Sequence, residues 1–230
     1  MSMIDLKYTH VIFDLDGTIL DTLEDLADAC NWMLAQHGWP EHDLDAYRYF
    51  VGNGMVRLVQ RATPDHAQEP DLQKQALSEF MARYDAHKAD KTRPYDGVPR
   101  LLARLKELGV HIAVLTNKMD TAAKPVVEQY YPGVFHLVQG ALPGLPVKPD
   151  PTLLCRVMER MGAKPEQTLF VGDSNVDIQT ARNGGLAGCG VLWGFRTRQE
   201  LEEEGAAYIA SRPEDILSIV LGNNKLESYT

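Results

Sequence analysis

The sequence contains little cysteine and no long apolar run, and both absences restrict the class of protein. Its three cysteines among 230 residues are Cys30, Cys155 and Cys189, an odd number without the short spacings of a metal-ligand cluster. Such isolated cysteines are typical of reduced thiols in the cytosol. No apolar segment is long enough to span a bilayer, and the amino end lacks the apolar stretch of a secretory signal. The sequence therefore predicts a cytoplasmic protein.

Positive charge is also in deficit. There are 23 Lys and Arg residues against 32 Asp and Glu residues, which leaves a formal net charge of −9. This balance argues against nucleic acid or an anionic membrane surface as the main partner. An anionic ligand would then need local cations or a metal ion. The chain is long enough to bury one large domain, or one domain with a modest insert.

The spacing of apolar residues divides the chain into two kinds of segment. Residues 9–15 form an apolar strand, and the stretch that follows has helical periodicity alone. We expect helices there over 23–37, 43–49, 55–62 and 72–87, and no strand between Leu20 and Lys91. This block of about seventy residues is therefore predicted to be all-helical.

From residue 93 onward helices and strands alternate. Strands are expected over 110–115, 134–138, 168–171, 187–193 and 208–209. Helices are expected over 98–108, 121–130, 152–161, 176–183, 199–204 and 214–221. This alternation predicts an α/β fold with a Rossmann-like parallel sheet. Residues 1–19 and 92–230 would form this core, and residues 20–91 would form a small all-helical domain inserted after the first strand.

Two carboxylates stand where the first strand ends, in the string Asp14-Leu15-Asp16-Gly17-Thr18. The carboxyl ends of strands in an open α/β sheet are where ligands bind. Two acids this close repel each other unless a cation or a proton separates them, so the pair predicts a divalent metal and a division of roles. Gly17 permits the sharp turn, and Thr18 can hydrogen-bond an anion.

Three more polar clusters are predicted near the same sheet edge. Thr116-Asn117-Lys118 follows a strand, Lys148-Pro149-Asp150-Pro151 precedes a helix, and Gly172-Asp173-Ser174-Asn175-Val176-Asp177 follows another strand. Each alone could be a helix cap, a solvated lysine or a turn. Together they would supply metal ligands, a nucleophile, a phosphoryl-oxygen donor and a cation.

The charges in this predicted site balance only if a metal is present. Three ionised aspartates, Asp14, Asp173 and Asp177, would be offset by Lys148 and Mg²⁺. The neutral pocket could then admit a phosphate dianion. Oxygen ligands suit Mg²⁺ rather than zinc or copper, so we expect Mg²⁺ as the cofactor.

In this order the clusters resemble the four motifs of the haloacid dehalogenase superfamily of phosphohydrolases. The helical block matches the small cap of that family, so the resemblance covers the whole chain. Three shorter strings are most similar to the bacterial phosphoglycolate phosphatases within it: Val51-Gly52-Asn53-Gly54, Leu115-Thr116-Asn117-Lys118 and Lys148-Pro149-Asp150-Pro151. The resemblance implies an enzyme that hydrolyses a small phosphorylated metabolite, 2-phosphoglycolate, to glycolate and phosphate.

The resemblance also implies a mechanism. Asp14 would attack phosphorus to form an aspartyl-phosphate, and Asp16 would protonate the leaving alkoxide and then activate water. Mg²⁺ would be held by Asp14, by the Asp16 backbone carbonyl and by Asp173. The cap would close over the site and carry specificity.

The remaining motif residues would handle the phosphoryl group. Thr116 and the Asn117 backbone amide would hold its oxygens, and Lys148 would neutralise charge on it and on the nucleophile. Asp177 would support Lys148 or a metal-bound water.

A two-carbon acid phosphate also offers a carboxylate to bind. Backbone amides of Gly52-Asn53-Gly54 could meet it, and Arg57 and Lys118 are candidate cations.

Other functions stay open on these residues. A sugar-phosphate phosphatase, a phosphomutase or a pyrophosphatase of the same superfamily would share the core motifs. A phospho-accepting receiver module of a signalling protein also uses acids, Thr and Lys on a parallel sheet, but it is about half as long and carries its acceptor on a middle strand. Aromatic residues of the helical block could form its core or a homodimer interface.

Overall fold

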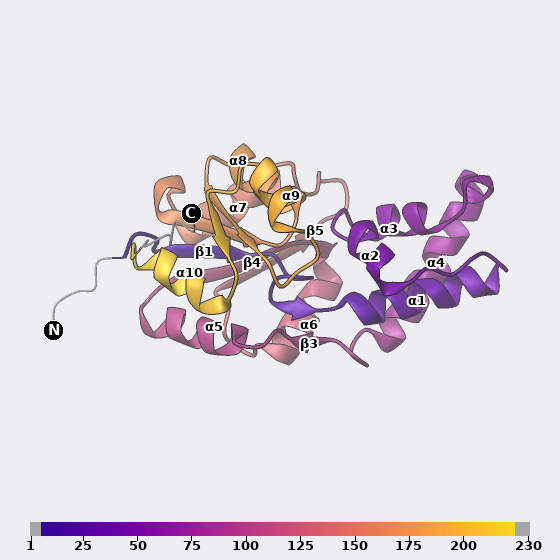
Figure 1. Ribbon diagram of the computed structural model, residues 1–230, viewed down its shortest axis with the longest axis horizontal. Coiled ribbons are helices and arrows are strands. Elements are labelled where there is room, and N and C mark those ends of the chain that lie inside the picture. Colours follow the sequence, from indigo (N-terminus) through magenta and orange to yellow (C-terminus); the bar gives the residue numbers. More distant parts are fainter. Residues whose placement is uncertain (1–5, 224–230) are drawn as a thin grey trace.

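The computed structural model describes residues 6–223 and is built on a six-stranded parallel sheet of order β5-β4-β1-β6-β7-β8 (Figure 1). All five neighbouring pairs are parallel. The strands are β1 (His10–Phe13), β4 (His111–Met119), β5 (Leu137–Ala141), β6 (Thr168–Gly172), β7 (Ala187–Val191) and β8 (Tyr208–Ala210). The predicted α/β class with a Rossmann-like parallel sheet is confirmed.

Helices cover both faces of this sheet because successive strand residues point to opposite sides. Val11 and Phe13 of β1 pack into one cluster with α5 (Val98–Glu107), α6 (Asp120–Tyr130) and α10 (Pro213–Val220). Ile12 packs on the other face in a cluster that holds α7 (Thr152–Met161) and residue Ala181 of α8 (Asn175–Asn183). Helix α9 (Arg198–Glu203) and the short 3₁₀ helix η2 (Pro165–Gln167) complete this part. Within residues 6–223 no helix has both the length and the apolar character of a membrane span.

Four helices stand between β2 (Leu20–Asp21) and β3 (Arg93–Pro94) and lie at one end of the long axis (Figure 1). They are α1 (Leu23–Gln36), α2 (Leu44–Phe50), α3 (Met55–Ala62) and α4 (Pro70–His87), with a 3₁₀ helix η1 (Asp65–Ala67). We call this segment, α1 through α4, the helical insert. Its apolar residues form a cluster of their own, into which Phe195 from the sheet side also packs.

Several details of the sequence prediction were wrong, among them the end of the strand predicted over 187–193, which stops at Val191. A strand does occur between Leu20 and Lys91, because β2 pairs antiparallel with β3; two residues are too few to show a period. Strand β4 continues beyond residue 115 to Met119 through a shift in register. Strand β5 begins at Leu137 rather than at Val134, because Val134 and its neighbour reach the core from the turn before the strand.

Both crossings between the sheet and the insert are held by hydrogen bonds. Asp25 in the first turn of α1 accepts from the backbone N–H groups of Lys91 and Thr92 and from the Thr92 hydroxyl, at 2.7–3.2 Å. On α6, the Tyr130 hydroxyl donates to Thr92 O, and just past that helix Tyr131 donates to Ile19 O. The outgoing and returning segments are therefore tied to one another and to the core.

Three adjacent histidine rings lie at the edge of the sheet where strands β1, β4 and β5 begin. His10 and His111 begin paired strands and stack with centroids 5.0 Å apart, and His136 lies 4.8 Å beyond His111. Burial, and then the charge of His111, lower the pKa of His10 below its ordinary value. The folded protein thus binds a proton here less readily than the unfolded chain does.

We expect this cluster to make the protein less stable in mild acid. His10 has a lower pKa in the folded than in the unfolded protein. Its contribution to the free energy of unfolding is therefore complete above the unfolded-state pKa of about 6.5 and is lost as the pH falls from there through the folded-state pKa. Relative to His111→Gln, the melting temperature of the unaltered protein should therefore fall as the pH drops from neutral toward about 5. The exposed His66 gives the control His66→Gln. An equal fall in both variants would contradict this account.

Candidate active site

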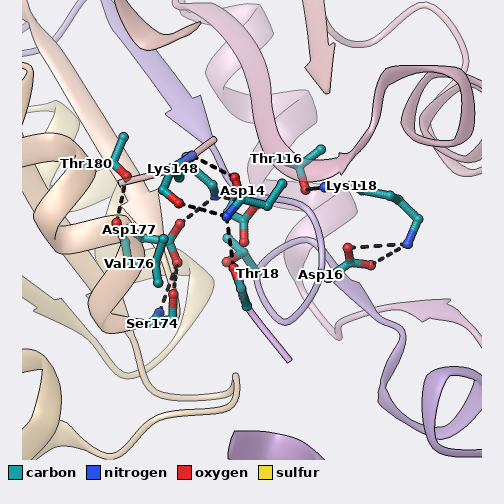
Figure 2. A network of polar contacts seen from close by, with 12 residues as sticks. Asp14, Asp16, Thr18, Thr116, Lys118, Lys148, Ser174, Val176, Asp177 and Thr180 are labelled. Atoms are coloured by element: carbon teal, nitrogen blue, oxygen red, sulfur yellow. Dashed lines mark hydrogen bonds and ion pairs between the residues drawn. The ribbon is translucent and has the colours of Figure 1, made fainter. Parts of the chain in front are cut away.

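The predicted carboxylates meet at the carboxyl edge of the sheet because β1 and β6 are neighbours in register, with Phe13 opposite Val171. Asp14 follows β1 directly, and its backbone N–H donates to Val171 O at 2.9 Å. Asp173 follows β6, and Asp177 lies in the first turn of α8. Figure 2 shows Asp14 and Asp177 on either side of Lys148, which comes from the loop before α7.

Lys148 lies between two aspartates. Its Nζ is 2.7 Å from Asp14 Oδ1 and 2.7 Å from Asp177 Oδ1, and its side chain is buried. The contact with Asp14 is an ion pair to a buried carboxylate oxygen. Burial alone would lower the pKa of Lys148, but the two aspartates raise it, which keeps the ammonium charged.

The donor set at this point suits a divalent cation. Asp14, Asp173 and Asp177 each offer an oxygen, and the three oxygens lie within 4.8 Å of one another. Burial, together with Asp177 and with Asp16, raises the pKa of Asp14 to about 7 despite Lys148. Burial, together with Asp177 and Asp14, raises the pKa of Asp173 well above its ordinary value. A hard cation placed here would replace protons, because it compensates the negative charge directly.

Among the three acids, Asp177 accepts the largest number of hydrogen bonds. Its Oδ2 accepts from the Ser174 N–H at 3.0 Å and from the Ser174 hydroxyl at 2.6 Å, while Oδ1 binds Lys148. This supports a positioning role for Asp177 and leaves Asp14 and Asp173 as the side chains most available to a metal. The predicted metal contact through the Asp16 backbone carbonyl stays a prediction, and the Asp16 side chain turns away toward Lys118 (Figure 2).

The loop after β7 fixes Asp173, and the sequence reasoning did not identify this loop. The Phe195 N–H donates to Asp173 Oδ2 at 2.7 Å. A Cβ on Gly194 would lie 2.2 Å from the Asp173 Cβ and 2.4 Å from Gly17 O, so a side chain cannot be accommodated. The glycine beside Trp193 at the end of a predicted strand was the available signal.

Thr116 and Asn117 also lie at the site. Thr116 Oγ1 accepts from the Lys118 N–H at 3.2 Å, which leaves its own proton free for another acceptor. The Asn117 side chain donates to Gly52 O and to Lys148 O, both at 3.1 Å, and accepts from the Lys148 N–H at 2.8 Å. Asn117 therefore joins the lysine loop to the helical insert.

A cavity lies between the sheet edge and the insert. Its lining from the core is Asp14, Asp16, Thr116, Asn117 and Lys118. Its lining from the insert is Leu26, Val51, Gly52, Gly54, Met55 and Leu58. The floor is thus polar, and the wall contributed by the insert is mainly apolar.

Two residues of the insert that were predicted near the substrate are not in that lining. Arg57 is exposed, and its Nη1 donates to Gln60 Oε1 at 3.0 Å. Asn53 Oδ1 accepts from Arg61 Nη2 at 2.8 Å. Arg57 is kept out of the cavity lining by its position on α3, because it lies on the exposed face of that helix whereas Leu58 lies on the buried face.

Two arginines, one from the core and one from the insert, form hydrogen bonds across the boundary between these two parts, which we call the seam. Arg196 donates to the carbonyls of Arg48 and Val51, and its guanidinium lies 5.1 Å from the Tyr49 ring centroid. In return Arg48 Nη1 donates to Gly194 O at 3.0 Å. The loop that fixes Asp173 is therefore also bonded to the insert.

Comparisons with known proteins agree with this geometry. Residues 11–191 match the profile of the haloacid dehalogenase-like hydrolases. A phosphoglycolate phosphatase of Pseudomonas putida is 39% identical over 86% of this chain and 75% of its own length. One from Thiobacillus denitrificans is 35% identical over 95% of this chain and 99% of its own.

Solved structures lead to the same family. The crystal structure of a phosphoglycolate phosphatase candidate from Lactobacillus delbrueckii subsp. bulgaricus superposes with a TM-score of 0.89. It is 32% identical and covers 94% of this chain and 99% of its own. With the match over most of the sequence and the motif residues gathered at one sheet edge, the chain belongs to the haloacid dehalogenase-like hydrolase family.

Proposed function

We propose that this hydrolase is a Mg²⁺-dependent phosphatase that converts 2-phosphoglycolate to glycolate and phosphate through an aspartyl-phosphate. The observation that carries the proposal is the meeting of Asp14 with Lys148 and Asp173, next to a cavity that Asp14, Asp16 and Thr116 line from the core and the helical insert lines from the other side. The Asp14 carboxylate lines this cavity beside the Lys148 ammonium, a position that suits attack on phosphorus.

The reaction has two steps at phosphorus. A carboxylate oxygen of Asp14 forms a bond to phosphorus as the ester P–O bond breaks, and Asp16 gives its proton to the leaving alkoxide. Water then attacks the aspartyl-phosphate, and Asp16 takes the proton of that water. Asp14 is released as a carboxylate together with inorganic phosphate.

The other residues stabilise the transferring group. Thr116 can donate its free hydroxyl proton and Asn117 its backbone N–H to phosphoryl oxygens, and Lys148 neutralises charge near Asp14. Mg²⁺, held by Asp14 and Asp173, would supply charge compensation for the nucleophile and the phosphoryl group. The Ser174 and Lys148 contacts of Asp177 keep the lysine in place.

We propose that residues 20–91 act as a cap that selects a small acid phosphate. The relatives named above are phosphoglycolate phosphatases, which supports the same substrate for this chain. Gly52 and Gly54 line the cavity with φ of +113° and +84°, and α3 begins at Met55 beside them without a side-chain cap. Unpaired N–H groups at a helix start favour a carboxylate.

A panel of phosphate esters tests this assignment. We expect 2-phosphoglycolate to be hydrolysed faster than neutral phosphates of similar size. Gly54→Val should reduce kcat/KM for 2-phosphoglycolate more than for an aryl phosphate, because a side chain at positive φ displaces the amides that would meet the carboxylate. Gly52→Val should act in the same direction.

Gly38→Val is the matched control, since Gly38 also has positive φ (+66°) and belongs to the insert but is exposed, and a Cβ added there would meet no atom within 4 Å. It should leave the substrate preference unchanged. Faster hydrolysis of hexose phosphates or pyrophosphate by the unaltered enzyme would refute the substrate and leave the phosphatase chemistry standing. A phosphomutase would instead return an isomerised sugar phosphate rather than free phosphate.

A further inference from the structure

Lys118 is engaged by two partners at the edge of the cavity. Its Nζ lies 3.0 Å and 3.3 Å from the two carboxylate oxygens of Asp16 and 2.8 Å from the hydroxyl oxygen of Tyr84. An ammonium group has three donors, and these three oxygens can take all of them. The sequence suggested Lys118 as a cation for a substrate carboxylate, and that role stays a prediction; in the structure its ammonium already has these protein acceptors.

The charge of Lys118 is matched inside the protein. The side chain is buried, with the residue 4% exposed. Burial alone would lower the pKa of Lys118, but Asp16 and then Tyr84 raise it above the ordinary value, so the group stays an ammonium. The buried ammonium would be costly to leave without acceptors, so its contacts fix the orientation of the Asp16 carboxyl group.

Tyr84 brings the helical insert into this contact. It lies on α4, is 1% exposed, and stacks on Phe80 with ring centroids 5.9 Å apart. Both residues belong to the hydrophobic cluster of the insert, which fixes where the hydroxyl stands. Lys118 Nζ also lies 4.9 Å from the Tyr84 ring centroid, so the ring and the hydroxyl both bind the cation.

We propose that Lys118 is a positioning residue that orients the Asp16 carboxyl for proton transfer, and that Tyr84 makes this orientation depend on the helical insert. This inference rests on the proposed function, in which Asp16 protonates the leaving group. Figure 2 shows that the Asp16 side chain points to Lys118 and away from the cluster around Lys148. Lys118 on β4 thus joins Asp16, in the loop after β1, to Tyr84 on α4 of the insert.

The expected consequence is selective for the leaving group. Departure of an alkoxide needs a proton, whereas a nitrophenolate leaves without one, so misplacing the acid slows only the first reaction. Lys118→Met keeps an unbranched side chain that is one atom shorter and removes its charge. We expect it to reduce kcat/KM for glycerol 2-phosphate at least roughly tenfold more than for 4-nitrophenyl phosphate, since general acid catalysis contributes about 10²–10⁴-fold.

Tyr84→Phe should act in the same direction with a smaller effect, because Lys118 keeps Asp16 and the ring. Tyr131→Phe is the matched control: Tyr131 is buried and its hydroxyl donates to Ile19 O at 2.7 Å, but it does not line the cavity. It should leave the ratio of alkyl to aryl turnover unchanged. Because Tyr84→Phe changes one atom, it keeps the test valid if Lys118→Met does not fold.

Asp16→Asn, measured on the same two esters, separates this inference from the proposed function. If it loses alkyl turnover selectively and both Lys118→Met and Tyr84→Phe follow, the positioning role is supported. If Asp16→Asn is selective but Lys118→Met slows both esters equally, the positioning role is overturned and the phosphatase mechanism stands. If Asp16→Asn is not selective, Asp16 is not the general acid and both fail.

One further outcome would overturn the inference. Glycerol 2-phosphate has no carboxylate, so a Lys118 that bound the substrate acid would not affect its KM. A rise in KM for 2-phosphoglycolate alone in Lys118→Met, with unchanged constants for glycerol 2-phosphate, would assign the lysine to substrate binding.

Discussion

Asp14→Asn should reduce kcat/KM by roughly four orders of magnitude or more, while the protein keeps its fold. Asparagine has the size of aspartate, but its amide cannot form the acyl phosphate that the proposed mechanism requires. The buried site also loses one of the negative charges that would hold Mg²⁺. Phosphate release from 2-phosphoglycolate measures the first effect, and the rise in melting temperature on adding excess MgCl₂ measures the second.

Asp150→Asn provides the control for Asp14→Asn. Asp150 belongs to the same string as Lys148, but it is exposed and accepts from the Thr152 N–H at 2.9 Å. It should keep both activity and the response to Mg²⁺. Near-normal turnover by Asp14→Asn, or full activity of the unaltered enzyme in excess chelator, would disprove the proposed mechanism.

Lys148→Met should destabilise the protein as well as inactivate it. Lys148 Nζ is 2.7 Å from both Asp14 and Asp177, and all three side chains are buried. Removing one partner of a buried ion pair costs about 3–5 kcal/mol, because the remaining charges lose their compensation. We expect a loss of this size in the free energy of unfolding measured with urea in the presence of chelator.

Mg²⁺ should restore part of the lost stability in Lys148→Met, because it compensates the same carboxylates. Lys164→Met, at an exposed position before η2, should change little. Equal unfolding free energies for Lys148→Met and the unaltered protein in chelator would show that the lysine does not compensate the aspartates.

The regular elements could be predicted because their signals are local. Helix α3 and helix α7 begin and end at the predicted residues, since the apolar period and the flanking Gly and Pro residues are all within the segment. The meeting of Asp14, Thr116 and Asp173 could also be predicted, because parallel strands bring their carboxyl ends to one edge.

Contacts across the seam could not be predicted, because they depend on how two distant segments meet. Nothing local to Lys118 indicates that its ammonium binds Tyr84 from α4, or that Arg196 reaches carbonyls of α2 and the residues after it. Arg57 illustrates the converse: its helix was predicted, but the side of the helix that faces the cavity is set by packing. Single-sequence patterns specify which residues are polar, not which partners they find.

The pairing of β2 with β3 has a consequence for how this architecture can change. Leu20 lies opposite Pro94, so the chain leaves and re-enters the core at adjacent points. A replacement segment would need only ends that meet in the same way, because the cost of closing a loop grows slowly with its length. The strands that carry Asp14 and Asp173 would keep their path. The core could thus retain its chemistry if the helical insert, which we propose selects the substrate, were exchanged or enlarged.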